Sequence, residues 1–380
     1  MGRLKQLGVK AGWILGRLLP VDPKKIVFSS YCGKGFGDNL RPIAEELLRR
    51  DRSLKMVWLT VDRTAADSLP EGIRACPYGS FRRGLELGTA KVWADNCRKE
   101  SAPFKKTKQC YLQTWHGFAL KQIERDAEKV LPEWYKNSAK RDARQTDLMV
   151  SDSRFMTEIY RRAFWYDGPV AEYGAPRNDG LIRGDRAAVK KVRQSLQLPA
   201  DRKLLLYAPT FRADGSLEPY SVDFPRLKQA CQQRFGGEFA MLVRLHPNVS
   251  ALAEQFVAEN GQVVNVTTYP DNQELLAAAD VLVTDYSSIM FDFMLTGRPC
   301  FQFASDIEAY RNDRNFYFSL DRLPFPLAED NAALERAVLG FREEDYRTAV
   351  DRFIREMGII TDGRGAERCA DWILQQMEQK

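Results

Sequence analysis

Residues 25–60, KIVFSSYCGKGFGDNLRPIAEELLRRDRSLKMVWLT, decide the fold class. The apolar runs 25–31 and 54–60 are typical of buried strands, and the run 40–50 between them has helical spacing. Strand, helix and strand in this order predict a parallel sheet. The alternation continues along the chain and restarts after a charged stretch, 184–198, which reads as a linker. We therefore predict an α/β protein of two doubly wound, Rossmann-like domains, residues 25–190 and 191–380, that face a cleft.

Size and composition fit a globular protein with ample core. The chain has 380 residues, of which 44% are hydrophobic and 28% charged, a length that suggests two domains. Its seven cysteines are scattered without a CxxC pair, which argues against a disulfide framework and against a cysteine zinc site. We see no signal-peptide pattern and no apolar run long enough to span a bilayer. We therefore expect a cytosolic protein.

The first 24 residues form a segment of their own. Six basic side chains and one acid lie within residues 1–25, although the net charge of the whole chain is only +6. Leu4, Leu7, Ala11, Ile14 and Leu18 follow helical spacing. Such a basic amphipathic helix can lie on an anionic membrane, or its apolar face can pack on the first domain. Nucleic-acid binding is the weaker interpretation, because no aromatic and basic module is visible.

Only two histidines occur in the chain, and each lies in a chemically dense segment. His116 belongs to QTWHG (113–117) and His246 to VRLHPN (243–248). Both fall just beyond predicted strands, and ligands of doubly wound sheets bind at the carboxyl ends of strands. Because imidazole exchanges protons near neutral pH, we interpret the pair as parts of one active site. The alternative is that either histidine merely packs at a strand end.

A second candidate segment is TDYSSIMFD (284–292). Ser287 and Ser288 occupy a strand-to-helix junction, where unpaired backbone N–H groups favour a phosphate or diphosphate. Asp292 lies one helical turn further on and could contact a sugar or glycerol hydroxyl. The alternative is that Ser287 only caps its helix.

Three arginines lie at or near predicted strand ends: Arg177, Arg212 and Arg244. Their rigid forks of donors match phosphate oxygens, so together with the histidines and serines they predict a polyphosphate-recognising cleft. Each arginine could instead face solvent or pair with a carboxylate. No histidine and carboxylate set has metal-ligand spacing; the use of Mg²⁺ nevertheless stays open, because phosphoryl transfer often employs it.

Several motifs together resemble the CDP-glycerol glycerophosphotransferase family of teichoic acid synthesis. They are QTWHG, YAPTFR (207–212), RLHP (244–247) and TDYSS through Asp292, and the similarity extends over roughly residues 25–375. The family's catalytic domain resembles GT-B glycosyltransferases. This resemblance implies two Rossmann-like domains around a cleft and a last helix that crosses back to the first domain.

The resemblance also implies roles for individual residues. His116 would take a proton from the acceptor hydroxyl, whose oxygen would attack the phosphorus bonded to glycerol and expel CMP, while His246 would contact the diphosphate. The implied substrate-binding residues are Gly117, Phe118, Ala119, Leu120, Arg177, Thr210, Phe211, Arg212, Arg244, Leu245, Ser287, Ser288 and Asp292. The chain departs from the family at Phe118 and Ala119, where Thr-Pro is common, which puts contacts beside the implied base in doubt.

The expected partners follow from the same resemblance. They are CDP-glycerol, a polyprenyl-diphosphate-linked glycan acceptor and an anionic membrane surface, which together imply a peripheral enzyme on the cytoplasmic face of the membrane. Three alternatives stay open: a CDP-ribitol or other CDP-polyol phosphotransferase, a GT-B nucleotide-sugar glycosyltransferase, and a non-catalytic membrane-surface binding protein. The sequence leaves the acceptor, the number of units added and the oligomeric state undecided.

Overall fold

The structure is a computed structural model that describes residues 3–99, 104–210, 212, 220–245, 253–254, 256–257, 263–307 and 315–379. The chain divides into two compact units. Unit 1 comprises Met1–His116, Ile123–Asp179 and Gly358–Lys380, and unit 2 comprises Gly117–Gln122 and Gly180–Met357. The division between the units therefore falls at Asp179/Gly180, earlier than the expected 190/191.

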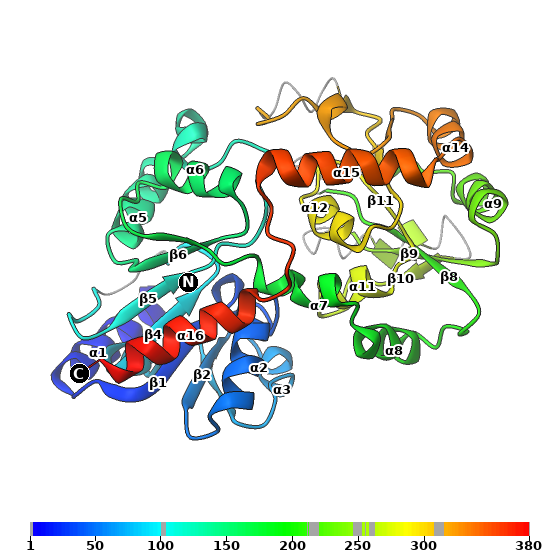
Figure 1. The fold of residues 1–380 in the computed structure, drawn as a ribbon. Coiled ribbons are helices and arrows are strands. Elements are labelled where there is room, and N and C mark those ends of the chain that lie inside the picture. The colour runs from blue at the N-terminus through cyan, green and yellow to red at the C-terminus, as the bar shows by residue number, and fades with distance from the viewer. Residues whose placement is uncertain are drawn as a thin grey trace. The chain divides into compact units, whose positions relative to one another are not determined.

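Unit 1 is built on a seven-stranded parallel sheet (Figure 1). Its strands, in spatial order, are β3 (Ile73–Pro77), β2 (Lys55–Thr60), β1 (Asp22–Ser29), β4 (Ala90–Asp95), β5 (Cys110–Gln113), β6 (Leu148–Ser151) and β7 (Val170–Glu172). The helices of this unit are α1 (Arg3–Leu18), α2 (Leu40–Arg50), α3 (Arg63–Asp67), α4 (Phe81–Thr89), α5 (Glu133–Ala143), α6 (Arg154–Ala163) and α16 (Gly365–Glu378), with the 3-10 segments η1 (Tyr31–Gly33), η2 (Glu124–Val130) and η3 (Pro176–Asn178).

Unit 2 repeats the pattern with a six-stranded parallel sheet. Its strands, in spatial order, are β10 (Val263–Asn265), β9 (Phe239–Val243), β8 (Lys203–Tyr207), β11 (Val281–Thr284), β12 (Cys300–Phe303) and β13 (Leu327–Ala328). The helices are α8 (Arg186–Ser195), α9 (Phe224–Phe235), α11 (Asn272–Ala278), α12 (Ile289–Phe293), α14 (Asn331–Leu339) and α15 (Glu343–Met357), with α7 (Asp179–Arg183) at the division and the 3-10 turns η6 (Met294–Thr296) and η7 (Leu320–Arg322).

The sheet of unit 2 has the strand order 3-2-1-4-5-6 of a doubly wound fold, and the sheet of unit 1 has the same order with β7 added at its edge, which confirms the predicted fold class. In each sheet the order reverses beside the first strand, between β1 and β4 in unit 1 and between β8 and β11 in unit 2. Ligands of such sheets bind outside the carboxyl ends of the strands at this point. The topology therefore gives each unit one favoured place for a polar site.

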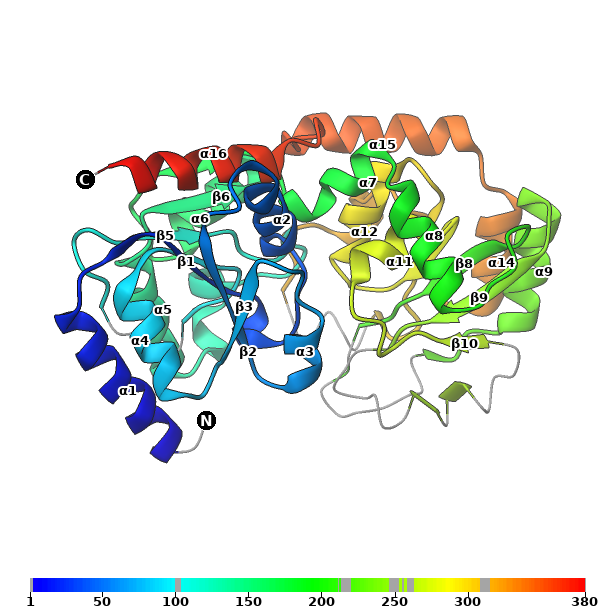
Figure 2. The same cartoon turned by 90° about the horizontal axis from the view of Figure 1, so that it is seen from below.

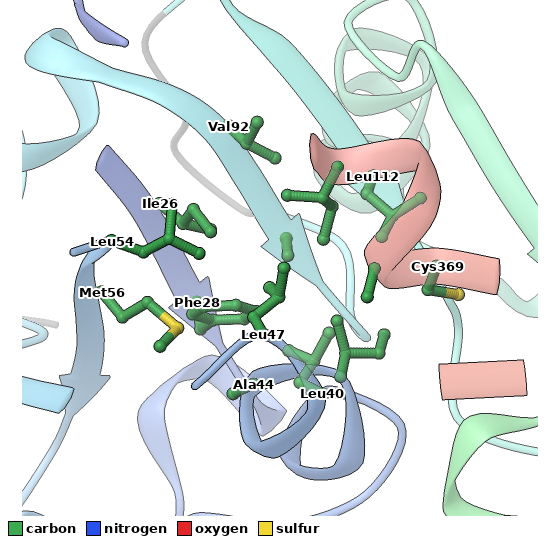
Figure 3. Packing of buried hydrophobic residues seen from close by; sticks show 14 of the residues in the cluster. Ile26, Phe28, Leu40, Ala44, Leu47, Leu54, Met56, Val92, Leu112 and Cys369 are labelled. Atoms are coloured by element: carbon green, nitrogen blue, oxygen red, sulfur yellow. The ribbon is translucent and has the colours of Figure 1, made fainter. Parts of the chain in front are cut away.

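The core of unit 1 includes the last helix of the chain. Ile26, Phe28 and Met56 from the sheet and Leu47 from α2 belong to one buried cluster (Figure 3). Cys369, Ala370 and Ile373 of α16 complete it. The helix that we expected to return to the first domain thus packs into that domain's core.

The charged stretch that we read as a linker is largely helical, so that prediction was wrong. Asp185 caps α8 by accepting a hydrogen bond from the backbone N–H of Ala188 at 2.9 Å. Lys191 of α8 forms an ion pair with Glu274 of α11 at 2.7 Å. The high charge of this stretch reflects a solvated helix face, and the buried Val192 anchors the helix to unit 2.

Helix α1 packs on α4 through glycines (Figure 2). A Cβ at Gly12 would lie 1.9 Å from the carbonyl oxygen of Phe81, and a Cβ at Gly84 would lie 2.0 Å from that of Val9. Only glycine permits helix backbones to approach so closely. The apolar stripe of α1 lies elsewhere on the helix: Leu7, Ile14 and Leu18 are 62%, 50% and 80% exposed. Helix α1 therefore packs through its glycine face and leaves its apolar stripe at the surface.

Candidate active site

His116 follows β5, next to the point where the strand order of unit 1 reverses. Its Nδ1 lies 2.6 Å from the backbone carbonyl oxygen of Asn96, the first residue after β4. Because a carbonyl oxygen only accepts hydrogen bonds, Nδ1 carries the proton and donates it, which leaves the lone pair of the neutral ring on Nε2. In this tautomer Nε2 can accept a proton, as a general base must.

The surroundings of His116 favour its neutral form. Burial lowers the pKa of the imidazole below its usual value, and the positive charge of Arg177 acts in the same direction. The hydrogen bond to Asn96 and the carboxylates of Asp38 and Glu124 act in the opposite direction without reversing the shift. The ring of His116 lies 4.3 Å from that of Trp115 and 5.5 Å from that of Tyr31, centroid to centroid. The site therefore favours the neutral imidazole, which lies beside two aromatic rings.

Strained backbone gathers in the loops around this histidine. Tyr31, Cys32, Asp38 and Trp115 have φ values of 43°, 57°, 55° and 52°. Residues other than glycine rarely adopt this left-handed conformation, and such residues cluster at active sites. The Tyr31 hydroxyl donates to Asp38 Oδ2 at 2.7 Å, which joins the two ends of the loop that contains Gly33, Gly35 and Gly37.

Arg177 belongs to the same group of residues in unit 1. It lies on η3, and its side chain is buried. Its backbone N–H and its Nη1 both donate to Asn39 Oδ1, at 3.1 and 3.3 Å. Thr210 and Arg244, which we also expected to bind substrate, belong to unit 2. Arg177 and His116 are the two expected site residues that unit 1 brings together.

A second polar group lies at the corresponding place in unit 2. Thr210, shortly after β8, donates from its backbone N–H and its hydroxyl to Asp285, at 2.8 and 2.6 Å. Asp285 is the first residue after β11. The two strands that flank the reversal point are thus joined at their carboxyl ends through Thr210 and Asp285.

Arg212 is held by carboxylates. Its guanidinium pairs with Asp306 at 2.6 Å and with Asp285 at 2.8 Å, and it also donates to the backbone oxygen of Thr210 at 2.6 Å. Both acids raise the pKa of this arginine, against the effect of burial. We expected Arg212 to bind substrate phosphate. Its contacts are those of the alternative interpretation, in which it pairs with carboxylates. Through these contacts it stabilises the Thr210–Asp285 pair.

Arg244 and Leu245 also make contacts within unit 2. Arg244 Nη1 donates to the backbone oxygens of Val266 and Tyr269, at 3.0 and 2.8 Å. Leu245 is a buried core residue whose backbone N–H donates to Thr267 Oγ1 at 3.1 Å. These bonds fix the loop that follows β10. The expected site residues His246 and Phe211 lie outside the described residues.

The serine pair precedes α12. Ser288 is the N-cap residue of this helix and makes no side-chain capping bond within the described part of the chain. The helix begins instead with backbone bonds to the oxygens of Ser287 and Ser288. The start of α12 is therefore stabilised by these backbone bonds and not by a capping Ser287 side chain, which was the alternative interpretation. Asp292, on the same helix, is buried and accepts a hydrogen bond from Gln273 Nε2 at 3.4 Å.

The segment Gly117–Gln122 belongs to unit 2, although His116 belongs to unit 1. A Cβ at Gly117 would lie 3.2 Å from Ser288 Oγ. Further along, Leu120 accepts a hydrogen bond from Tyr317 at 2.8 Å, and Gln122 donates to Asn315 at 2.9 Å. The segment is thus anchored in unit 2, with its first residue against the serine pair.

Phe118, Ala119 and Leu120, which we expected to bind substrate, are core residues of unit 2. All three are buried. The Phe118 ring lies 4.5 Å from that of Phe291 and 6.1 Å from that of Phe353. The aromatic side chain at position 118 fills an aromatic cluster of unit 2, and this packing explains the departure at that position.

Three residues beside His116 and Thr210 were missed in the sequence: Asn39, Asn96 and Asp285. Asn96 and Asp285 each come directly after a predicted strand, so the strand-end argument used for His116 also applied to them. Asn39 had only its place before a helix as a signal. Within the described ranges, no group of three histidine, cysteine or acidic side chains is arranged to hold a metal ion.

Fold and site together define a GT-B-like protein: two Rossmann-like units, each with a polar group at the reversal point of its sheet. The family model described as CDP-Glycerol:Poly(glycerophosphate) glycerophosphotransferase matches residues 14–375. The chain belongs to this family.

The chain is similar in sequence to several teichoic acid proteins. The chain is 30% identical to a teichoic acid poly(glycerol phosphate) polymerase of Staphylococcus epidermidis, over 95% of this chain and 52% of that protein. It is 29% identical to a teichoic acid glycerol-phosphate transferase of Staphylococcus aureus, over 94% of this chain and 95% of that protein. The chain thus spans about half the length of the first relative and nearly all of the second.

The structure is similar to that of the wall teichoic acid polymerase TagF. The TM-score is 0.83 at 29% identity, over 98% of this chain and 94% of that one. A variant of the same polymerase soaked with CDPG has a TM-score of 0.85.

Proposed function

We propose that the protein transfers glycerol phosphate from CDP-glycerol to a hydroxyl group of an acceptor and releases CMP. In this reaction the acceptor oxygen forms a bond to the phosphorus that bears glycerol. The bond from that phosphorus to the bridging oxygen breaks, and the electron pair leaves with CMP. The observation that carries the proposal is the His116–Asn96 hydrogen bond, because it leaves a neutral Nε2 able to accept the proton of the hydroxyl.

The donor is assigned to unit 2. The Thr210–Asp285 pair and the serine pair both follow strand ends of this unit, the usual place for a nucleotide in a doubly wound domain. The hydroxyl groups of Ser287 and Ser288 serve as hydrogen-bond donors to the diphosphate. His246, three residues after the last residue of β9 in the sequence, contacts the diphosphate and stabilises or protonates the departing phosphate. Phosphoryl transfer depends mostly on such positioning and charge stabilisation.

Gly117, the residue after His116 in the chain, lies beside the serine pair of unit 2. A Cβ at Gly117 would lie 3.2 Å from Ser288 Oγ. This approach supports a role for Gly117 at the donor phosphates.

The acceptor is a polyprenyl-diphosphate-linked glycan, and α1 holds the protein on the anionic cytoplasmic face of the membrane. The exposed Leu7, Ile14 and Leu18 support this proposal, as do Lys10 and Arg17, which are exposed on the same helix. Each basic side chain near an anionic surface contributes about 1 kcal/mol of attraction. No described helix has the length and apolar character needed to cross a membrane.

A direct assay tests the donor. Purified protein is incubated with a lipid-linked disaccharide and with CDP-glycerol, CDP-ribitol or a UDP-sugar in separate reactions. Release of CMP, together with an acceptor mass gain of one or more glycerol phosphates, supports the proposal. If only the CDP-ribitol reaction turns over, the donor is CDP-ribitol. If UDP is released, the protein is a glycosyltransferase and the proposed reaction is wrong.

A further inference from the structure

Asn39 joins the histidine loop to Arg177. This residue precedes α2 and is only 2% exposed. Its Nδ2 lies 3.1 Å from the backbone oxygen of Trp115 and 3.4 Å from that of Thr114, the two residues before His116. Its Oδ1 accepts both the backbone N–H and the Nη1 of Arg177. One side-chain amide thus makes four contacts with two segments far apart in sequence.

The chemistry of these contacts requires an amide. Backbone oxygens only accept hydrogen bonds, so they must face the NH₂ group, whereas Arg177 only donates and must face the oxygen. This fixes the orientation of the Asn39 side chain. A carboxylate at this position could not donate to the Trp115 oxygen, and an aliphatic side chain would remove all four of these hydrogen bonds.

The Asn39 contacts reach a strained part of the backbone. Trp115 has a left-handed conformation with a φ of 52°, and Asp38, beside Asn39, has a φ of 55°. Such conformations persist only where surrounding contacts hold them. The hydrogen bond from Asn39 to the Trp115 oxygen is one such contact. It acts on the peptide group that connects Trp115 to His116.

We propose that Asn39 is a positioning residue that fixes the His116 imidazole and the Arg177 guanidinium relative to each other. The proposal rests on the proposed function, in which His116 is the base. Asn39 itself touches neither substrate nor the reacting atoms. Its amide NH₂ group bonds to the backbone that precedes His116, and its oxygen accepts hydrogen bonds from Arg177. Loss of this amide lowers the rate of the chemical step and leaves the affinity for the donor largely unchanged.

The presence of only two histidines makes the proposal testable by NMR. Protein labelled with ¹⁵N-histidine gives two imidazole spin systems, and His246→Ala assigns them. The charged or titratable groups near His116 are Tyr31, Asp38, Cys97, Glu124 and Arg177. In Asn39→Ala the histidine loop becomes more accessible to water, and Arg177 loses its two hydrogen bonds to Asn39. Both changes raise the pKa of His116 toward its ordinary value.

The experiment compares Asn39→Ala and Asn39→Ser with Thr157→Val. Thr157 is also buried in unit 1, but its hydroxyl bonds to the backbone oxygen of Ser153 at 3.0 Å, away from the histidine loop. We expect kcat for CMP release to fall about 10- to 100-fold in the Asn39 variants. KM for CDP-glycerol stays within about twofold, and the His116 pKa rises. The Thr157→Val variant keeps the wild-type rate and histidine titration.

Each outcome decides the proposal. An unchanged kcat or an unchanged His116 titration in a folded Asn39 variant would overturn it, as would equal losses in Thr157→Val. Asn39→Ser retains a small polar side chain, so it decides the question if circular dichroism shows that Asn39→Ala does not fold. If the wild-type protein releases no CMP, the proposed function fails, while the NMR titration still reports whether Asn39 positions His116.

Discussion

The His116 Nδ1 donates to the backbone oxygen of Asn96 at 2.6 Å, and this bond determines which nitrogen of the ring can act as a base. Asn96 follows β4 and His116 follows β5, and these strands are paired neighbours in the sheet. The tautomer is therefore set by the parallel register of two strands. Since the partner is a backbone oxygen, no single side-chain substitution at position 96 removes it.

The pH dependence of turnover follows from the lowered pKa of His116. A general base works only when it is unprotonated, so kcat/KM is constant near neutral pH and falls as the pH drops through this pKa. Because the pKa lies below that of free imidazole, the fall begins below the usual range of histidine. The break in the pH profile and the NMR titration of His116 should coincide. A break that does not follow this titration would contradict the assignment.

The packing of Phe118 predicts a loss of stability. Phe118→Ala removes a buried ring from the cluster with Phe291 and Phe353, so the free energy of unfolding of unit 2 should fall by about 3–5 kcal/mol. Phe118→Leu, which retains much of the apolar volume, should cost less. Denaturant unfolding measures both. If Phe118→Ala left stability unchanged and altered only KM, its side chain would bind substrate after all.

The serine pair should affect binding more than stability. Because Ser288 caps no backbone N–H through its side chain, Ser288→Ala and the double change with Ser287→Ala should leave the melting temperature nearly unchanged. The loss of one hydrogen bond to a charged phosphate should raise the Kd for CDP-glycerol about 10- to 100-fold in Ser288→Ala, since each such bond contributes about 1.5–3 kcal/mol, and the double change should raise it further. Calorimetric titration tests this. Equal affinity in the double variant would remove the serines from the donor site.

The exposed stripe of α1 predicts membrane binding that can be weakened without unfolding. Replacement of Ile14 and Leu18 by Glu should lower partition onto phosphatidylglycerol vesicles by more than about 10-fold, because each buried Leu or Ile side chain contributes about 1.5–3 kcal/mol. Sedimentation with vesicles measures the bound fraction.

A matched control for this prediction is Leu339→Glu, which changes an exposed leucine of unit 2. It should bind vesicles like the wild type. Unaltered binding of the α1 double variant would contradict a membrane role for this helix.

The sequence pattern predicted the fold well because strand and helix signals are local. The run 25–31 became β1 (Asp22–Ser29), and the strand-end rule located His116, Thr210 and Ser287. The packing partners could not be predicted in this way. Arg212 meets its acids at Asp285 and Asp306, and Phe118 meets Phe291 only in the folded unit.

The environment of α1 could have been predicted more closely. Gly8, Gly12 and Gly16 recur every four residues, and Gly84 and Gly88 have the same spacing. Small residues at this interval are typical of closely packed helices. The apolar stripe drew attention to the exposed face, whereas the glycines mark the face that packs.

The most direct test of the central claim is CMP release from CDP-glycerol by the wild-type protein and by His116→Gln, with a lipid-linked acceptor. We predict that the wild type releases CMP and adds glycerol phosphate to the acceptor. His116→Gln should bind CDP-glycerol with nearly wild-type affinity and turn over about 10²- to 10⁴-fold more slowly, the usual contribution of a general base. Wild-type turnover in His116→Gln, or no CMP release by the wild type, would contradict the account.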